Sequence, residues 1–232
     1  MLQWRSETRP SRNAAFAATL QDAPTGQLAE VIGLMGACMK FDRGAEIFAE
    51  DEAAEYIYMV ASGAVRLSKL LSDGRRQIGA FYLPGDIFGL EAEETHSFSA
   101  ESICDSQVVL VKRSALVAEA VRDGEMARQL WGKTVGHLQR AQSHMLLLGR
   151  KNAQERIAAF LMEMAGRQDS DGSVELPMSR QDIADYLGLT IETVSRTLTQ
   201  LERDGVISMP ISRHIVFNDA AALDKMNDGW AA

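Results

Sequence analysis

Residues 179–205 contain the pattern that most restricts how this chain can fold. Ser179 precedes Asp182 by three residues, the spacing of a capping box at the start of a helix. Gly188 follows the apolar run of that helix, and Thr190 is placed to cap a second one. Two short helices joined by a glycine turn form a helix-turn-helix.

The second helix of this pair has one apolar side. Its inward-facing side chains are predicted to be Val194, Leu198 and Leu201, and Gly205 can end the helix. The next segments, VISMP and HIVFN, read as two strands around Pro210. The sequence therefore predicts a winged helix-turn-helix.

The opposite side of the second helix is polar. The side chains of Glu192, Ser195 and Arg196 point outward from its N-terminal half, the part that enters the major groove in DNA-bound helix-turn-helix proteins. Arginine can chelate guanine, glutamate can accept from a cytosine amino group, and serine can contact a base or a phosphate. The alternative is that Glu192 and Arg196 form an ordinary surface ion pair at i and i+4. The residues expected to contact the DNA backbone are Ser179, Arg180, Thr190, Thr193, Thr199, Arg213 and His214.

The charge balance limits how such a protein can hold DNA. The net charge is −8, and residues 150–232 contain 9 basic against 13 acidic side chains. An acidic molecule is a poor nonspecific nucleic-acid binder. Contacts to the bases should therefore contribute an unusually large share of the DNA-binding free energy.

Cysteine usage and hydropathy exclude several other classes. The two cysteines, Cys38 and Cys104, lie far apart in apolar stretches, so we expect buried, inert thiols rather than a redox sensor, and no metal or other cofactor. No apolar run reaches the ~18–20 residues of a membrane helix, and no signal peptide is evident, so a cytoplasmic protein is expected. Because no nucleophile–base pair or phosphate loop appears, an enzyme is not expected.

The chain divides into four segments that differ in residue composition and pattern. Residues 1–27 read as an N-terminal arm, and residues 28–113 alternate short apolar runs with glycine turns such as Ser62-Gly63 and Asp73-Gly74. This alternation is typical of an antiparallel β-barrel or sandwich. A long helical region follows over 114–149, and the winged helix-turn-helix occupies 150–232. The fold class is therefore α+β.

The helical region is expected to begin with Ser114 as its cap and to continue from about Glu125 to Leu148. It is apolar on two faces, which suggests packing against its own β-domain and against a second chain. A fully buried helix in a monomer is the alternative. One face follows the rhythm of a coiled coil, with Leu130, Thr134, His137, Ala141, His144 and Leu148. The second face contributes Trp131, Leu138 and Met145 to the predicted dimer interface.

Three segments and the long helix together carry a family resemblance. The segments are YIYMVASGAVRLSK, LPGDIFGLE and MSRQDIADYLGLTIETVSRTLTQLERDGVI. On these motifs the chain from about residue 28 to 224 resembles the cyclic-AMP receptor/Fnr superfamily of bacterial transcription regulators. The resemblance implies a cyclic-nucleotide-binding-like β-roll with jelly-roll topology, a dimerisation helix, and a homodimer that binds palindromic DNA and contacts RNA polymerase.

Two differences from the superfamily's motifs indicate which of its branches this chain resembles. Nucleotide-binding members have a Gly-Glu and then an Arg-Ser pair, whereas here Leu90 follows Gly89, and His96 or Ser97 stands in the arginine position. The N-terminal cysteine cluster of oxygen-sensing Fnr proteins is absent through residue 37. What remains resembles the FixK-type branch, an activator of microaerobic respiration and nitrogen fixation genes that uses neither a cyclic nucleotide nor an iron–sulfur cluster.

The resemblance also implies two more specific roles. The order Glu192, Ser195, Arg196 is similar to the Fnr-type reader of TTGAT…ATCAA sites, whereas the cyclic-AMP receptor type has glycine in place of Ser195. The turn that carries the implied contact to RNA polymerase consists of Ser72, Asp73, Gly74 and Arg75, for which an ordinary exposed loop is the alternative. A regulator whose β-roll still binds a small effector is the competing functional hypothesis.

Overall fold

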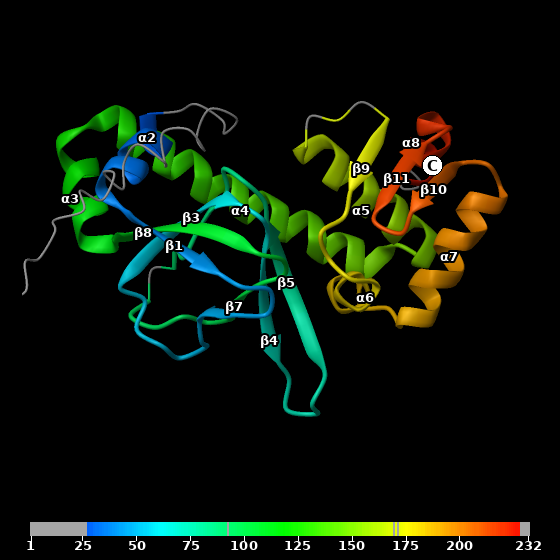
Figure 1. The fold of residues 1–232 in the computed structure, drawn as a ribbon, viewed down its shortest axis with the longest axis horizontal. Helices are drawn as coiled ribbons and strands as arrows, with labels where there is room; N and C mark the ends of the chain where they lie inside the picture. The colour runs from blue at the N-terminus through cyan, green and yellow to red at the C-terminus, as the bar shows by residue number, and fades with distance from the viewer. Residues whose placement is uncertain (1–26, 92, 169, 171, 228–232) are drawn as a thin grey trace, which may run out of the picture.

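A β-rich body and a smaller, mainly helical body lie along one long helix, α4, which spans Gly124–Arg150 (Figure 1). The computed structural model describes residues 27–91, 93–168, 170 and 172–227. The predicted N-terminal arm therefore lies outside the described residues, apart from Gln27.

The β-rich body consists of two four-stranded antiparallel sheets, with strand orders β1-β8-β3-β6 and β2-β7-β4-β5. This confirms the predicted jelly-roll-like β-roll. The strands are β1 (Ala37–Phe41), β2 (Glu46–Phe48), β3 (Tyr56–Ser62), β4 (Val65–Leu70), β5 (Arg76–Tyr82), β6 (Ile87–Phe88), β7 (Ser99–Ser102) and β8 (Ser106–Lys112). Aromatic and β-branched side chains from both sheets, among them Phe48, Tyr58 and Phe88, pack into the space between them.

The predicted glycine turns are present, and the two differ in how tightly they are packed. Gly63 and Gly74 both have φ of 83°, a left-handed conformation that side-chain-bearing residues rarely adopt. A Cβ atom on Gly63 would lie 2.3 Å from Ser106 Oγ, whereas a Cβ on Gly74 would meet nothing within 4 Å. The Ser106 hydroxyl accepts a hydrogen bond from the Ala64 backbone N–H at 3.1 Å. Gly63 is therefore required for space as well as for its backbone angle.

Two features of the β-rich body differ from the expectations. Helix α2 (Gln27–Met35) precedes the first strand and buries Leu28 and Ile32 beside β8 and α4. The prediction that both cysteines are buried is wrong for Cys38, which is exposed because β1 is an edge strand of its sheet. Cys104 is half-buried in the turn between β7 and β8.

The long helical region is two helices rather than one. Helix α3 (Arg113–Arg122) has Lys112 as its N-cap, with no side-chain cap, so the expectation that Ser114 caps it is wrong. Asp123 breaks the region, and its side chain accepts hydrogen bonds from the backbone N–H groups of Glu125 and Met126 at the start of α4.

The helical body contains the predicted helix-turn-helix and one additional strand. Its helices are α5 (Ala153–Arg167), α6 (Arg180–Leu187), α7 (Ile191–Arg203) and α8 (Ala220–Asn227). Its strands are β9 (Ser173–Glu175), β10 (Ile207–Ile211) and β11 (His214–Phe217), which form a sheet in the order β10-β11-β9. The predicted wing is confirmed, but β9 was not predicted. None of the helices in the described residues is long and apolar enough to cross a membrane.

Candidate DNA-binding site

Local capping interactions set the geometry of α6 and α7. The Ser179 hydroxyl accepts from the Asp182 backbone N–H, and the Asp182 carboxylate accepts from the Ser179 N–H, so the predicted capping box is present. Gly188 ends α6 with a φ of 61°, and the Thr190 hydroxyl caps α7 by accepting from the Thr193 backbone N–H at 3.2 Å. The chain therefore turns within three residues from one helix into the next.

The buried stripe of α7 is the predicted one. Val194, Leu198 and Leu201 are each no more than 1% exposed, and they belong to the core that α5 and α6 share. Because these three side chains face inward, Ser195 and Arg196 lie on the exposed side of the helix.

The exposed side of α7 has free hydrogen-bonding groups. Within the described residues, the side chains of Ser195 and Arg196 make no hydrogen bond or ion pair, and Arg196 lies beyond 4.0 Å of the Glu192 carboxylate. The alternative of a Glu192–Arg196 ion pair is therefore not seen. A hydrogen bond from its own backbone N–H, with a second from the Thr190 hydroxyl, holds the pKa of Glu192 below its ordinary value. Glu192 is thus an anionic acceptor beside a free guanidinium group.

Several predicted backbone-contacting side chains already have partners within the protein. The hydroxyls of Ser179 and Thr190 serve as helix caps, and the Thr193 hydroxyl lies 3.1 Å from that of Thr190. A guanidinium NH2 of Arg180 donates to the Ser212 carbonyl at 3.3 Å, and burial lowers the pKa of Arg180. These contacts hold the two helices and the wing together.

The wing has one partnered and one exposed basic side chain. His214 Nδ1 lies 2.6 Å from Glu175 Oε1, across the pairing of β11 with β9, the strand that was not predicted. Arg213 and Thr199 are exposed and, in the described part of the chain, make no side-chain hydrogen bond. They are therefore the predicted backbone-contacting side chains that remain free to bind a phosphate.

In the structure, the two apolar faces of α4 differ in exposure, and one of them is open to solvent. Trp131, Leu138 and Met145 are 70%, 57% and 64% exposed, and Thr134 and Ala141 are exposed between them. These five residues are spaced alternately by three and four positions, and we call them the α4 seam. The fully buried helix is therefore excluded.

The other predicted seam residues are half-buried in the single chain and contact its own interior. Leu130 packs against the α2 cluster, the His137 ring lies 5.7 Å from Tyr82, and the His144 ring stacks on Tyr186 at 4.0 Å. Leu148 is half-buried against the core of the helical body. Burial, with the nearby Arg140 charge, lowers the pKa of His137 to about 4, so the ring is neutral at physiological pH.

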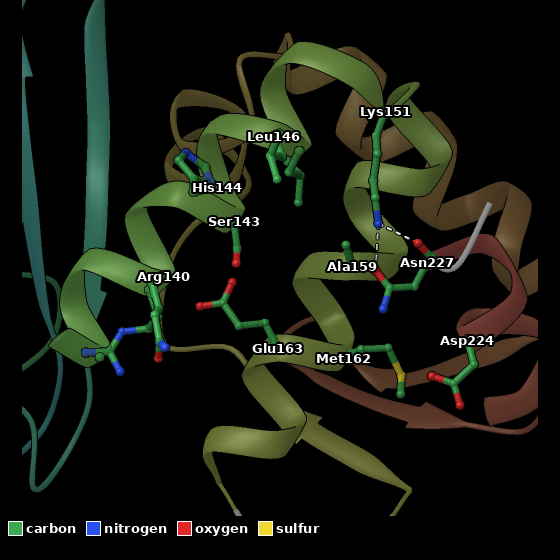
Figure 2. A pocket seen from close by; sticks show the side chains of 13 residues that line it. Arg140, Ser143, His144, Leu146, Lys151, Ala159, Met162, Glu163, Asp224 and Asn227 are labelled. Atoms are coloured by element: carbon green, nitrogen blue, oxygen red, sulfur yellow. Dashed lines mark hydrogen bonds between the residues drawn. The ribbon is translucent and has the colours of Figure 1, made fainter. Parts of the chain in front are cut away.

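A pocket of about 820 Å³ lies where α4, α5 and α8 meet (Figure 2). At its rim, Lys151 Nζ donates to the Asn227 side-chain oxygen at 2.7 Å and to its backbone carbonyl at 2.5 Å. Glu163 points into the pocket from α5, and burial raises the pKa of its carboxyl group. These hydrogen bonds from Lys151 connect the end of α8 to the C-cap of α4.

The surroundings of Glu91 and His96 bear on whether the β-roll could hold a cyclic nucleotide. His96, one of the two residues that the resemblance puts in the arginine position, is 1% exposed, and its ring stacks on Phe48 at 3.6 Å. Its Nδ1 lies 3.4 Å from the carboxylate of Glu91, and Leu90 stands in the glutamate position. A cyclic phosphate would meet an anionic side chain instead of a guanidinium group.

The predicted polymerase-contacting turn is an exposed hairpin tip. Ser72, Asp73, Gly74 and Arg75 are all exposed, and Arg75 NH2 lies 2.7 Å from Asp73 Oδ2. Its geometry fits an ordinary loop and a contact surface equally well.

A β-roll joined through a long helix to a winged helix-turn-helix, with free polar groups on α7, defines a DNA-binding protein. Residues 155–226 match the Crp-like helix-turn-helix domain family, and residues 38–123 match the cyclic nucleotide-binding domain family.

Curated relatives agree with this class. The chain is 52% identical to a nitrogen fixation regulation protein, FixK, from Azorhizobium caulinodans, over 86% of this chain and 82% of that protein. It is 46% identical to the FixK protein of Rhizobium meliloti, over 74% of this chain and 78% of that protein. FixK2 from Bradyrhizobium japonicum has a solved structure that superimposes with a TM-score of 0.80 at 53% identity, covering 83% of this chain and 97% of that one.

The chain therefore belongs to the FixK-type Crp/Fnr transcription regulators. Its homologues are regulators and not enzymes.

Proposed function

We propose that this protein is a homodimeric transcription activator that reads a TTGAT…ATCAA-like palindrome through α7 and contacts RNA polymerase. The observation that carries the proposal is the free, exposed pair Ser195 and Arg196 above a fully buried stripe, with the Glu192 carboxylate beside them. In a major groove, Arg196 is suited to guanine, Glu192 to a cytosine amino group, and Ser195 to a base edge. Three adjacent side chains of this kind match one short half-site.

The α4 seam supports the homodimer. A two-fold axis beside α4 would bury Trp131, Leu138 and Met145 of both copies, which are otherwise an exposed apolar stripe on a protein surface. The same axis would supply a second α7, and a palindrome requires two copies related by a two-fold axis.

The β-roll supports control without a cyclic nucleotide. His96 is enclosed by the chain's own aromatic residues, and the Glu91 carboxylate 3.4 Å from its ring would repel a phosphate bound beside it. Abundance or modification of the protein would then set its activity in the cytoplasm. By its likeness to FixK proteins, we assign it to genes of microaerobic respiration and nitrogen fixation.

A second candidate function is an effector-sensing regulator, and a cavity between the β-roll and α4 favours it. This cavity has a volume of about 250 Å³ and is lined by Tyr82, Phe98 and His137 among others. Ligand pockets usually measure about 300–1,000 Å³, so it suits a molecule smaller than a nucleotide. Thermal-shift measurements with cyclic AMP, haem and a panel of smaller metabolites separate the two proposals, since a rise of several degrees with any of them would overturn effector-free control.

The direct test of the main proposal replaces Arg196 with alanine. Binding to a TTGAT…ATCAA duplex is followed by fluorescence anisotropy, with Lys225→Ala as the matched control because Lys225 is an exposed cation on α8. Arg196→Ala should lose roughly 1–3 kcal/mol per half-site, and Lys225→Ala should bind as the wild type does. Unchanged affinity and sequence preference in Arg196→Ala would overturn the assigned role.

A further inference from the structure

Two arginines of the β-roll reach the first helix of the helix-turn-helix. Arg66 on β4 and Arg76 at the start of β5 place guanidinium nitrogens 2.9 and 2.7 Å from the same oxygen, Oδ1 of Asp182. Arg76 also lies 2.8 Å from Oδ2 of Asp185. The pairs to Asp182 join residues that are 116 and 106 positions apart in the sequence. They connect the two bodies of the protein.

The charged groups of Asp182, Arg66 and Arg76 are largely shielded from solvent. The Asp182 side chain is 6% exposed, and those of Arg66 and Arg76 are 16% and 27% exposed. Burial alone would raise the pKa of Asp182, but hydrogen bonds from Ser179 and the charges of both arginines hold it below its ordinary value. A buried carboxylate of this kind depends strongly on keeping its partners.

Asp182 uses its two oxygens for two different purposes. Oδ2 accepts from the Ser179 backbone N–H at 3.0 Å and from the Ser179 hydroxyl at 2.7 Å, which fixes the N-terminus of α6. Oδ1 accepts from Arg66 and Arg76. The β-roll therefore holds α6 by a residue of its N-terminal capping box, and α7 follows α6 after the short turn at Gly188.

Arg167 of α5 also joins the two bodies by donating to the Phe81 carbonyl at 2.8 Å and to Asp86 Oδ2 at 2.5 Å. The rest of the contact is largely apolar and less directional. The Phe81 ring lies 5.1 Å from that of Tyr186, and Ile78 joins the same core. Burial of apolar surface favours association but does not select one orientation. Charge-assisted hydrogen bonds depend on both distance and angle, so the contacts of Arg66 and Arg76 with α6, together with the Arg167–Asp86 contact of α5, select the orientation.

We infer that Arg66 and Arg76 are positioning residues for DNA binding, because through Asp182 and Asp185 they fix the orientation of the helix-turn-helix relative to α4. In a dimer formed along α4, that orientation sets the angle and separation of the two α7 helices. The inference rests on the proposed dimeric reading of a palindrome. It also explains how the two bodies keep one arrangement without a bound effector.

The spacing between half-sites makes this inference measurable. One added base pair rotates a half-site by roughly 34–36° about the DNA axis, because B-DNA has 10–10.5 base pairs per turn. A rigidly oriented pair of α7 helices discriminates strongly against such a change. A loosely held pair discriminates less, although each α7 still recognises its own half-site.

The test compares full-length Arg76→Gln and Asp185→Asn with Arg75→Gln. Arg75 is the matched control because it lies in the same hairpin and, among the residues that the structure describes, pairs only with the exposed Asp73. Anisotropy titrations use three duplexes, namely the palindrome with the spacer the wild type prefers, the same palindrome with one base pair added, and a single half-site. Asp185→Asn leaves the Asp182 cap in place, so it keeps the test valid if Arg76→Gln unfolds.

Arg76→Gln and Asp185→Asn should each bind the preferred palindrome roughly tenfold more weakly. They should keep wild-type affinity for the single half-site and lose most of the preference between the two spacers, whereas Arg75→Gln should match the wild type throughout. An unchanged spacer preference in both variants, or an equal loss on all three duplexes, overturns the positioning role. Failure of the wild type to bind any of the three duplexes overturns the proposed function itself.

Discussion

Truncation of Trp131 should weaken the dimer more than any other single change in the α4 seam. Trp131 is 70% exposed in the single chain. A tryptophan buries roughly 200 Å², so ~140 Å² remains for a partner, worth ~3.5 kcal/mol at ~25 cal/mol per Å². Two-fold symmetry doubles this figure, and ordering of side chains on association offsets about half of it. We therefore expect Trp131→Ala to raise the dimer dissociation constant roughly 100- to 1,000-fold.

Sedimentation equilibrium over a range of protein concentrations measures this constant directly. Leu70→Ala is the control, because Leu70 is similarly exposed, at 68%, but lies on the β4 strand and not on α4. Its dissociation constant should stay at the wild-type value. If Trp131→Ala dimerises as tightly as the wild type, or if both variants weaken equally, the assignment of the seam to Trp131, Leu138 and Met145 is refuted.

Three further predictions concern stability, measured by urea denaturation. Gly63→Ala should destabilise the fold by about 2–4 kcal/mol and Gly74→Ala by about 1 kcal/mol, because only Gly63 combines a positive φ with a Cβ overlap; equal losses would contradict this. Leu198→Ala should cost about 2–5 kcal/mol through a cavity beneath α7, and a loss below ~1 kcal/mol would contradict its full burial. His137 has a folded pKa of about 4, below the ~6.5 of an unfolded chain, so the unfolded state binds the proton first and wild-type stability falls between about pH 6.5 and 4. His137→Gln should lose less stability over that window, and an identical pH profile would refute the neutral buried ring.

The helix-turn-helix could be predicted from the sequence because its signals are local. The Ser179 cap, the Gly188 turn and the α7 stripe each depend on residues within one or two helical turns. Local chemistry of this kind leaves few alternative backbone paths. The exposed position of Ser195 and Arg196 then follows from which side chains are buried.

The orientation of α4 could not be predicted in the same way. Both of its faces are apolar, so periodicity alone does not say which of them meets the β-roll. The choice depends on distant partners, Tyr82 for His137 and Tyr186 for His144, which only the folded chain brings close. In the folded chain both histidines lie half-buried beside tyrosine rings.

Long-range pairs were missed for the same reason. The capping box already accounts for an aspartate at position 182, so the sequence gives no reason to expect its second role, the contact with Arg66 and Arg76. The three-residue strand β9 is too short to show strand periodicity, and it is stabilised by contacts distant in sequence, chiefly its pairing with β11 and the burial of Val174. In the sequence, the one sign of this second role is that Arg66 and Arg76 lie on either side of the exposed hairpin turn at residues 72–75.

The central claim is that two α7 helices read a palindrome through Glu192, Ser195 and Arg196. Selection of bound duplexes from a random library, with the wild type and Ser195→Gly in parallel, tests it most directly. The wild type should enrich TTGAT…ATCAA, and Ser195→Gly should change the preferred base at one position in each half-site while keeping the two-fold symmetry. Enrichment of no palindrome by the wild type, or of identical sites by both proteins, would contradict the account.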